Sequence, residues 1–141
     1  MTANVNSGST YVITNVKAGT AMDLSAGDEK SITGWPVHGG INQQWTLTWT
    51  GSAWTFRSVW TGTYLSIDGS PADGTRLVAS STPFNWHIWR DESNPNTFRV
   101  FVPSTHQNLD LYGHGLATPG DPITLWSTWN GLHQTWKFTQ A

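Results

Sequence analysis

A carboxylate, an indole and a carboxamide follow one another in the first third of the chain, at Asp23, Trp35 and Asn42. A carboxylate accepts hydrogen bonds from two hydroxyl groups at once, and a carboxamide both donates and accepts. An exposed aromatic face can pack on the apolar C–H face of a pyranose ring. These three side chains are the minimal set for holding a sugar, and together they predict a shallow carbohydrate-binding site.

The segment that carries Trp35 and Asn42 occurs a second time near the C-terminus. Residues 32–45 read ITGWPVHGGINQQW, and residues 123–136 read ITLWSTWNGLHQTW. The positions at which the copies agree are Ile32/Ile123, Thr33/Thr124, Trp35/Trp126, Gly40/Gly131, Gln43/Gln134 and Trp45/Trp136. Since the agreement includes the indole and the residues around the carboxamide, both copies are candidate sites.

A third, weaker copy lies between these two and ends at Trp89. Trp45, Trp89 and Trp136 are separated by 44 and 47 residues, and we expect these three indoles to lie in the core. Each repeat opens with an aromatic residue, and an Asp stands twelve residues after it; the pairs are Tyr11/Asp23, Phe56/Asp68 and Phe98/Asp110. This spacing predicts a threefold repeat.

Short apolar or alternating runs separated by turn residues cover the chain, and no helical periodicity is sustained. The runs are residues 11–16, 46–49, 54–60, 76–79, 97–102, 123–126 and 135–139. Short strands at a spacing of about 8–12 residues are typical of an all-β sandwich or barrel. Three repeats of four strands favour a closed barrel with threefold pseudosymmetry, the β-trefoil. We expect a single domain over residues 1–141, with repeats at about 10–52, 53–94 and 95–141.

Composition argues against several other classes of protein. The net charge is −2 and the seven basic residues are scattered, so we expect no nucleic-acid partner. No apolar run approaches the roughly 20 residues of a membrane helix, so we expect no membrane insertion. The chain has no cysteine, and its first residues show neither a charged region nor an apolar core. We therefore expect a cytoplasmic protein, with secretion without a signal peptide left open.

The titratable residues favour neither catalysis nor metal binding. The histidines show no metal-ligand spacing, and we expect His106 and His114 to lie on the polar surface. Glycoside hydrolysis needs two neighbouring carboxylates, whereas Asp23, Asp68 and Asp110 occupy equivalent positions in separate repeats. We expect no enzyme activity, no metal and no cofactor.

The triplets Gln43-Gln44-Trp45 and Gln134-Thr135-Trp136 resemble the Q-x-W motif of ricin-B-type lectins. The chain from about residue 11 to residue 139 resembles the small fungal, mushroom-type members of that family. The resemblance implies a β-trefoil that binds carbohydrate in one pocket per repeat, where an Asp accepts sugar hydroxyls and an aromatic ring stacks on the sugar. It also implies galactose- or N-acetylgalactosamine-containing glycans as partners, and it allows a homodimer.

Matching the family pattern residue by residue gives a principal site in the first repeat and an altered site in the third. The first-repeat candidates are Asp23, Trp35, His38, Gly39, Asn42 and Gln43. The third-repeat candidates are Asp110, Trp126, Trp129, Asn130 and His133, with His133 at the position of Asn42. In the second repeat Ala79, Trp86 and His87 stand where the first has Trp35, Asn42 and Gln43, so we expect no binding there.

Other roles stay open for some of these residues. Asp23 can support a turn, Gln43 can be satisfied internally, and either Trp35 or His38 can meet the sugar. Trp126 lies in an apolar run, so that core and surface positions are both open to it, whereas we expect Trp129 at the surface. The alternative functions are a protease inhibitor acting through the loops at 93–96 or 113–122, and a structural partner subunit that binds no sugar.

Overall fold

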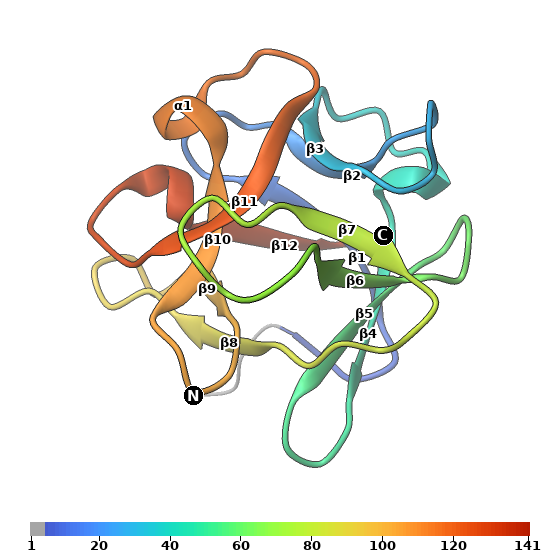
Figure 1. The fold of residues 1–141 in the computed structure, drawn as a ribbon, viewed down its shortest axis with the longest axis horizontal. Helices are drawn as coiled ribbons and strands as arrows, with labels where there is room; N and C mark the ends of the chain where they lie inside the picture. Colours follow the sequence, from blue (N-terminus) through green and yellow to red (C-terminus); the bar gives the residue numbers. More distant parts are fainter. Residues whose placement is uncertain (1–4) are drawn as a thin grey trace.

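Twelve β-strands run through residues 5–141, the part of the chain that the computed structural model describes (Figure 1). The strands are β1 (Thr10–Asn15), β2 (Ala21–Leu24), β3 (Ile32–Trp35), β4 (Trp45–Trp49), β5 (Trp54–Ser58), β6 (Tyr64–Ile67), β7 (Leu77–Ser80), β8 (His87–Arg90), β9 (Phe98–Phe101), β10 (Gln107–Leu111), β11 (Asp121–Ser127) and β12 (Trp136–Gln140). Single-turn helices are η1 (Ile41–Gln43), α1 (Tyr112–Gly115) and η2 (Leu132–Gln134). The strands fall into three sets of four.

The first and fourth strands of each set form a closed barrel. β1 pairs with β12 and β4, β4 with β5, and β9 with β8 and β12. The ring closes between β5 and β8 through a bridge from Trp54 to Trp86. Because every barrel strand has two neighbours, the barrel presents no open edge that could pair with another chain.

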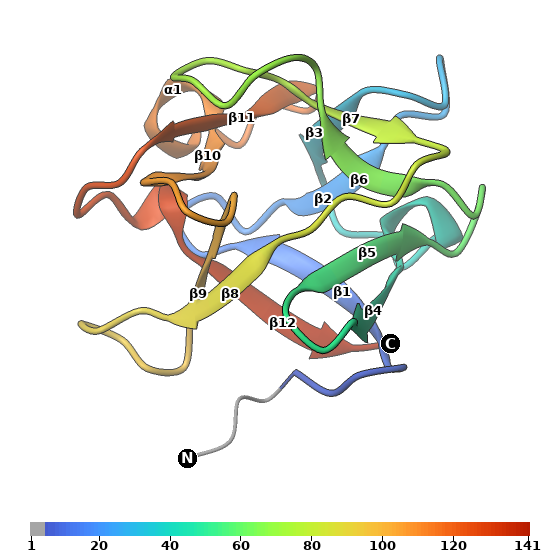
Figure 2. The ribbon, with the colours of Figure 1, turned by 60° about the horizontal axis from the view of Figure 1, so that its bottom comes forward.

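The remaining strands form three hairpins that cap one end of the barrel. β2 pairs with β3, β6 with β7 and β10 with β11. The hairpins also pair with one another around the axis, at Gly34 with Asp121, Ser31 with Val78 and Arg76 with Thr124. Figure 2 shows them above the barrel, with the C-terminus at the opposite end. A barrel with three equivalent hairpins is a β-trefoil, as the repeat predicts.

Three indoles mark the equivalent core positions of the repeats. Each is buried and donates its Nε1–H to a backbone carbonyl, from Trp45 to Met22, Trp86 to Leu65 and Trp136 to Leu109, at 3.1, 3.0 and 3.4 Å. A buried indole needs such an acceptor for its N–H group. Our prediction that Trp89 is the core residue of the second repeat is therefore wrong: its side chain is 60% exposed on β8, and Trp86 lies in the core instead.

The second repeat is also displaced by two residues from the register that we predicted. Tyr11 pairs with Trp45 and Phe98 with Trp136, and the equivalent partner of Trp86 is Trp54 rather than Phe56. Counting twelve residues from Trp54 gives Ser66.

Hairpin pairing gives the same result. Ile67 pairs with Leu77 as Leu24 pairs with Ile32, so Ser66 holds the position of Asp23. The assignment of Asp68 to that position is thus wrong. Ser80, rather than Ala79, stands at the position of Trp35, because Ser80 pairs with Tyr64 as Trp35 pairs with Ala21.

No helix within residues 5–141 is long and apolar enough to cross a membrane.

Replacing Trp86 and Trp89 separately by Ala tests this placement. Removing a buried Trp costs about 3–5 kcal/mol of unfolding free energy, whereas a surface change is usually within about 0.5 kcal/mol. We expect Trp86→Ala to show the large loss and Trp89→Ala the small one in urea denaturation. Trp86→Phe serves as a milder variant if Trp86→Ala does not fold. Equal losses at the two positions would contradict the assignment of Trp86 to the core.

Candidate functional site

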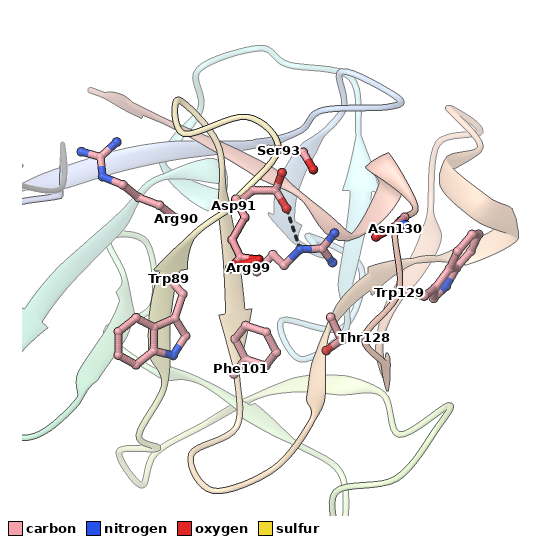
Figure 3. Close-up of a pocket in the computed structure, with 10 residues that line it drawn as sticks. Trp89, Arg90, Asp91, Ser93, Arg99, Phe101, Thr128, Trp129 and Asn130 are labelled. Atoms are coloured by element: carbon pink, nitrogen blue, oxygen red, sulfur yellow. Dashed lines mark hydrogen bonds and ion pairs between the residues drawn. The ribbon is translucent and has the colours of Figure 1, made fainter.

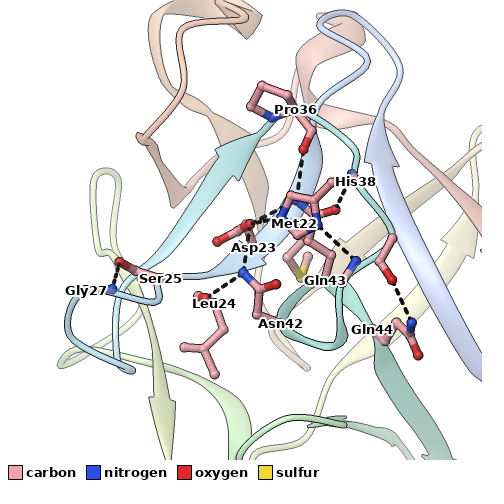
Figure 4. Close-up of polar contacts among 12 residues, drawn as sticks. Met22, Asp23, Leu24, Ser25, Gly27, Pro36, His38, Asn42, Gln43 and Gln44 are labelled. Atoms are coloured by element: carbon pink, nitrogen blue, oxygen red, sulfur yellow. Dashed lines mark hydrogen bonds and ion pairs between the residues drawn. The ribbon is translucent and has the colours of Figure 1, made fainter.

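The Asp23 carboxylate lies at the base of a surface hollow in the first repeat. Its strand, β2, is buried along its whole length, and Asp23 is only 4% exposed. Its Oδ2 atom accepts hydrogen bonds from Gln43 Nε2 at 2.9 Å and from Asn42 Nδ2 at 3.1 Å (Figure 4). No group within residues 5–141 donates to Oδ1. One carboxylate oxygen is therefore held in place, and the other is available to a ligand.

Gln43 braces this arrangement from behind. It is fully buried on η1, and its Nε2 also donates to the Pro36 carbonyl at 3.0 Å, while its Oε1 accepts from the His38 backbone N–H at 3.0 Å. Burying a carboxylate is costly unless donors compensate for the lost water. Gln43 supplies one of these donors and fixes the loop from Pro36 to His38. It thus has the internal role that its position in the sequence left open.

Trp35, His38 and Asn42 line the hollow, which has a volume of about 480 Å³. The Trp35 ring is 42% exposed and the His38 side chain 46% exposed. His38 Nδ1 accepts a hydrogen bond from the Gly40 backbone N–H at 2.9 Å, and Nε2 lies 3.9 Å from Asp23 Oδ2. Both rings can therefore contact a ligand bound over the Asp23 carboxylate.

The remaining polar groups of the hollow come partly from outside the first repeat. Asn42 Nδ2 is shared between Asp23 and the Leu24 carbonyl at 3.2 Å, and no donor in the described part of the chain reaches the Asn42 carbonyl oxygen, which can therefore accept from a ligand. Gly39 does not line the hollow; it has φ of 74°, and its carbonyl accepts from Gln44 Nε2. Arg76, just before β7, does line it and was missed by sequence reasoning, because the packing of hairpins, rather than the repeat pattern, brings it there.

Burial raises the pKa of the Asp23 carboxyl above its ordinary value. The hydrogen bond from Gln43, the neighbouring His38 imidazole and the hydrogen bond from Asn42 each work against this effect, but burial is the largest cause. The charged form of Asp23 is therefore easier to protonate than that of an exposed aspartate.

The third repeat builds the same brace around Asp110. Gln134 Nε2 donates to Asp110 Oδ2 at 2.8 Å and to the Ser127 carbonyl at 3.1 Å. Gln134 Oε1 accepts from the Trp129 backbone N–H at 3.0 Å, as Gln43 Oε1 accepts from His38. Trp129 thus takes the place of His38, as the sequence predicts.

His133 replaces Asn42 with a different chemistry. It is 2% exposed, and its Nε2 lies 3.1 Å from Asp110 Oδ2, close enough for an ion pair but poorly aligned for a hydrogen bond. Its ring packs against His114 and Trp129, each with centroids 5.2 Å away. Burial lowers the pKa of His133, while Asp110 opposes this change. His133 is therefore a buried neighbour of the carboxylate and does not face a ligand directly.

Aromatic rings surround the third-repeat hollow, whose volume is about 400 Å³. Its lining residues are Asp110, Tyr112, Gly113, His114, Thr124, Trp126 and Trp129. Trp126 and Trp129 are 43% and 47% exposed, which places Trp126 at the surface. Gly113 and His114 have φ of 68° and 59°, so α1 is a left-handed turn that folds this loop against the hollow. His114 is exposed, as we expect, but it also lines this hollow and packs against Trp129, and Tyr112 was missed.

Like Gly39, the predicted site residue Asn130 does not line either hollow within residues 5–141. Asn130 is exposed and lines a neighbouring groove together with Arg99 (Figure 3). In the second repeat Ser66 and Ser80 replace the carboxylate and the indole, and Phe84 stands two residues before Trp86, where the other repeats have the bracing Gln. Phe84 packs on Trp86 at a centroid distance of 4.9 Å. The absence of binding in the second repeat stays a prediction.

Comparisons with known proteins agree with this geometry. The model of the ricin-type beta-trefoil lectin domain-like family matches residues 2–80. A ricin B-like lectin from Macrolepiota procera, solved in complex with lactose, is 63% identical over 99% of this chain and 100% of its own, with a TM-score of 0.97. The agglutinin of Rhizoctonia solani is 27% identical over the same shares, with a TM-score of 0.88.

The fold is shared more widely. A designed threefold-symmetric protein, ThreeFoil, is 19% identical over 94% of this chain and 99% of its own, and superposes with a TM-score of 0.84. A search of curated proteins gave no match. The family match, together with 63% identity over nearly the whole chain, identifies this protein as a fungal ricin B-like lectin, a carbohydrate-binding β-trefoil.

Proposed function

We propose that the chain binds galactose- or N-acetylgalactosamine-containing glycans, with its principal site in the first repeat. The observation that carries this proposal is the Oδ1 atom of Asp23, which has no donor among residues 5–141 and lies at the base of a hollow walled by Trp35 and His38. A sugar hydroxyl can donate to that oxygen while its ring packs on an indole. The lactose bound by the Macrolepiota procera lectin, a galactose-containing disaccharide, supports galactose as the ligand.

The third repeat supplies a second site in this proposal. Asp110 and Trp126 correspond to Asp23 and Trp35, but His133 is buried and offers no carboxamide. A ligand there loses the hydrogen bond that Asn42 can make. We therefore assign weaker monosaccharide binding to the third repeat.

Among the described residues 5–141, each of the two hollows is lined by one carboxylate, Asp23 in the first repeat and Asp110 in the third. Glycoside hydrolysis uses two carboxyl groups about 5–10 Å apart. This supports binding without catalysis. The segment from Gly113 to His114, which lies in a loop considered for protease inhibition, forms part of a hollow wall and so favours the sugar-binding role.

Single shallow sites bind weakly, since each neutral hydrogen bond contributes only about 0.5–1.5 kcal/mol and a monosaccharide affinity is on the order of mM. Two sites on one chain would raise the affinity for a glycan-coated surface through avidity. A homodimer would double the number of sites, and light scattering coupled to gel filtration measures the mass that distinguishes it from a monomer.

Lactose titration into Trp35→Ala, Asp23→Ala and Asp110→Ala tests the ranking of the sites. Removing the acceptor Asp23 should weaken the first site roughly 10- to 100-fold, and removing the exposed Trp35 ring should weaken it roughly 2- to 10-fold. We expect Asp110→Ala to retain most of the calorimetric signal.

Trp49→Ala is the matched control, because Trp49 is another exposed indole, 45% accessible, outside both hollows. Circular dichroism verifies that each variant is folded, and Asp23→Asn replaces Asp23→Ala if the latter is not. Unchanged lactose binding by both Asp23→Ala and Trp35→Ala would overturn the assignment of the principal site. A wild-type protein that binds no glycan on an array would overturn the proposed function.

The pH dependence of lactose binding tests the role of the Asp23 charge. Because burial raises the pKa of Asp23, the ionised acceptor is lost at a higher pH than for an exposed aspartate. We expect the association constant to fall as the pH is lowered from neutrality through this raised pKa toward the ordinary aspartate value of 3.8. Calorimetry on Asp110→Asn isolates the first site.

Protonation of Asp23 changes the free energy of unfolding in the opposite direction to lactose affinity. Between the ordinary and the raised pKa the folded chain binds more protons than the unfolded chain, so the contribution of Asp23 to the free energy of unfolding falls as the pH rises. Asp23→Asn should remove both dependences. Lactose affinity that stays constant over this range would contradict a role for the ionised carboxylate.

A further inference from the structure

A polar groove of about 540 Å³ lies directly beside the third-repeat hollow (Figure 3). Trp129 lines both, so that one indole ring stands between the two spaces. At the other end of the groove lies the exposed Trp89 ring, and Figure 3 shows Arg99 and Phe101 between the two indoles. The Asp110 hollow and the groove therefore meet at the Trp129 ring.

A chain of hydrogen bonds ties the groove to the Asp110 carboxylate. Arg99 Nε donates to Asp91 Oδ1 at 2.9 Å, and Arg99 Nη1 donates to Gln134 Oε1 at 3.1 Å. The same Gln134 donates to Asp110 Oδ2 at 2.8 Å. The side chains of Arg99 and Asp91 are 11% and 12% exposed, which restricts their movement. The polar groups of both spaces therefore belong to one braced unit.

This link exists only in the third repeat of the described chain. Arg99 follows Phe98 on β9, and the residue that follows the equivalent Tyr11 on β1 is Val12. In the first repeat Gln43 Oε1 accepts from the His38 backbone N–H, and no arginine within residues 5–141 donates to it. The brace itself is shared by the two repeats, but its extension into a second binding space is not.

The groove has the groups that a neutral sugar requires. Arginine carries five N–H donors, and the Nη2 group of Arg99 has no acceptor among residues 5–141. The exposed side chains of Ser93 and Asn130 are likewise uncommitted there. Two cations and two anions line the groove, namely Arg90, Arg99, Asp91 and Glu92. Because these charges balance, the lining favours hydroxyl groups over a carboxylate or a sulfate.

We propose that the third repeat binds a neutral oligosaccharide of at least two sugar residues, with one residue over Asp110 and the next across Trp129 against Arg99. This inference rests on the proposed function and deepens it, because it assigns an oligosaccharide rather than a monosaccharide to the third repeat. The first repeat, which lacks the groove, binds a terminal sugar alone.

Calorimetry on the Asp23→Ala variant, in which the first site is silenced, tests the proposal. The ligands are galactose, lactose and a neutral tetrasaccharide that ends in galactose. We expect at least one of the longer ligands to bind this variant tenfold or more tightly than galactose does. Adding Ser93→Ala and Asn130→Ala should reduce that gain at least threefold and leave galactose binding unchanged. Asn96→Ala, an exposed asparagine on the same loop outside the groove, is the matched control.

Indole N–H signals in NMR spectra provide a readout that does not depend on affinity. The Trp129 signal should shift with every ligand, and the Trp89 signal should shift with an oligosaccharide only. Two results would overturn the extended site and leave the proposed function standing. In the first, Asp23→Ala binds galactose and the oligosaccharides equally well. In the second, Asp23→Ala binds none of them while the wild type binds lactose. A wild type that binds none of these ligands would remove both. Tighter binding of a sialylated tetrasaccharide than of the neutral one would overturn the assignment of a neutral ligand.

Discussion

The hydrogen bond from a buried glutamine amide to a buried aspartate carboxylate is the interaction on which each candidate site depends. Gln43 reaches Asp23 at 2.9 Å and Gln134 reaches Asp110 at 2.8 Å. Without this donor a carboxylate at such depth would be costly, and burial would favour its neutral form. The indole of the Q-x-W motif follows two residues after each Gln and is buried in the core. Its N–H donates to the backbone carbonyl of the residue just before the Asp, as Trp45 donates to Met22. One short segment therefore fixes both the barrel and the site, which is why its recurrence predicts both.

Where this segment is intact, the sequence predicts the fold and most of the side chains that gather around the two carboxylates; where it is not intact, the sequence predicts the wrong register. In the second repeat Phe84 stands in place of the Gln. The register predicted there from the sequence starts at Phe56, whereas the structure starts at Trp54. The prediction therefore takes Asp68, instead of Ser66, as the counterpart of Asp23. Since side chains alternate along a strand, a shift of two residues keeps every side chain on its own face, and the apolar pattern looks equally good in either register. β2 gives no alternating signal at all, because all four of its residues are buried.

Residues that reach a site from another element could not be assigned from spacing. Arg76 lines the same hollow as Asp23 because the hairpins of adjacent repeats pair around the axis, where Arg76 bridges to Thr124. Tyr112 and His114 join the third-repeat hollow because a left-handed turn folds their loop against it. Both arrangements follow from tertiary packing, and a polar loop in the sequence looks the same whether it covers a site or extends into solvent.

The threefold scaffold constrains the brace but leaves its neighbours free to change. At the position of Asn42 the third repeat has the buried His133, and at the position of Val12 it has Arg99, yet the Gln–Asp bond and the loop that it fixes are the same. These two changes replace the carboxamide near the carboxylate with an imidazole and add a guanidinium that donates to the bracing glutamine. The hollow around Asp110 is therefore lined by more aromatic rings than the hollow around Asp23, and it shares Trp129 with the neighbouring groove. Because the core indole and its carbonyl acceptor are not involved, such changes can alter the ligand without altering the fold.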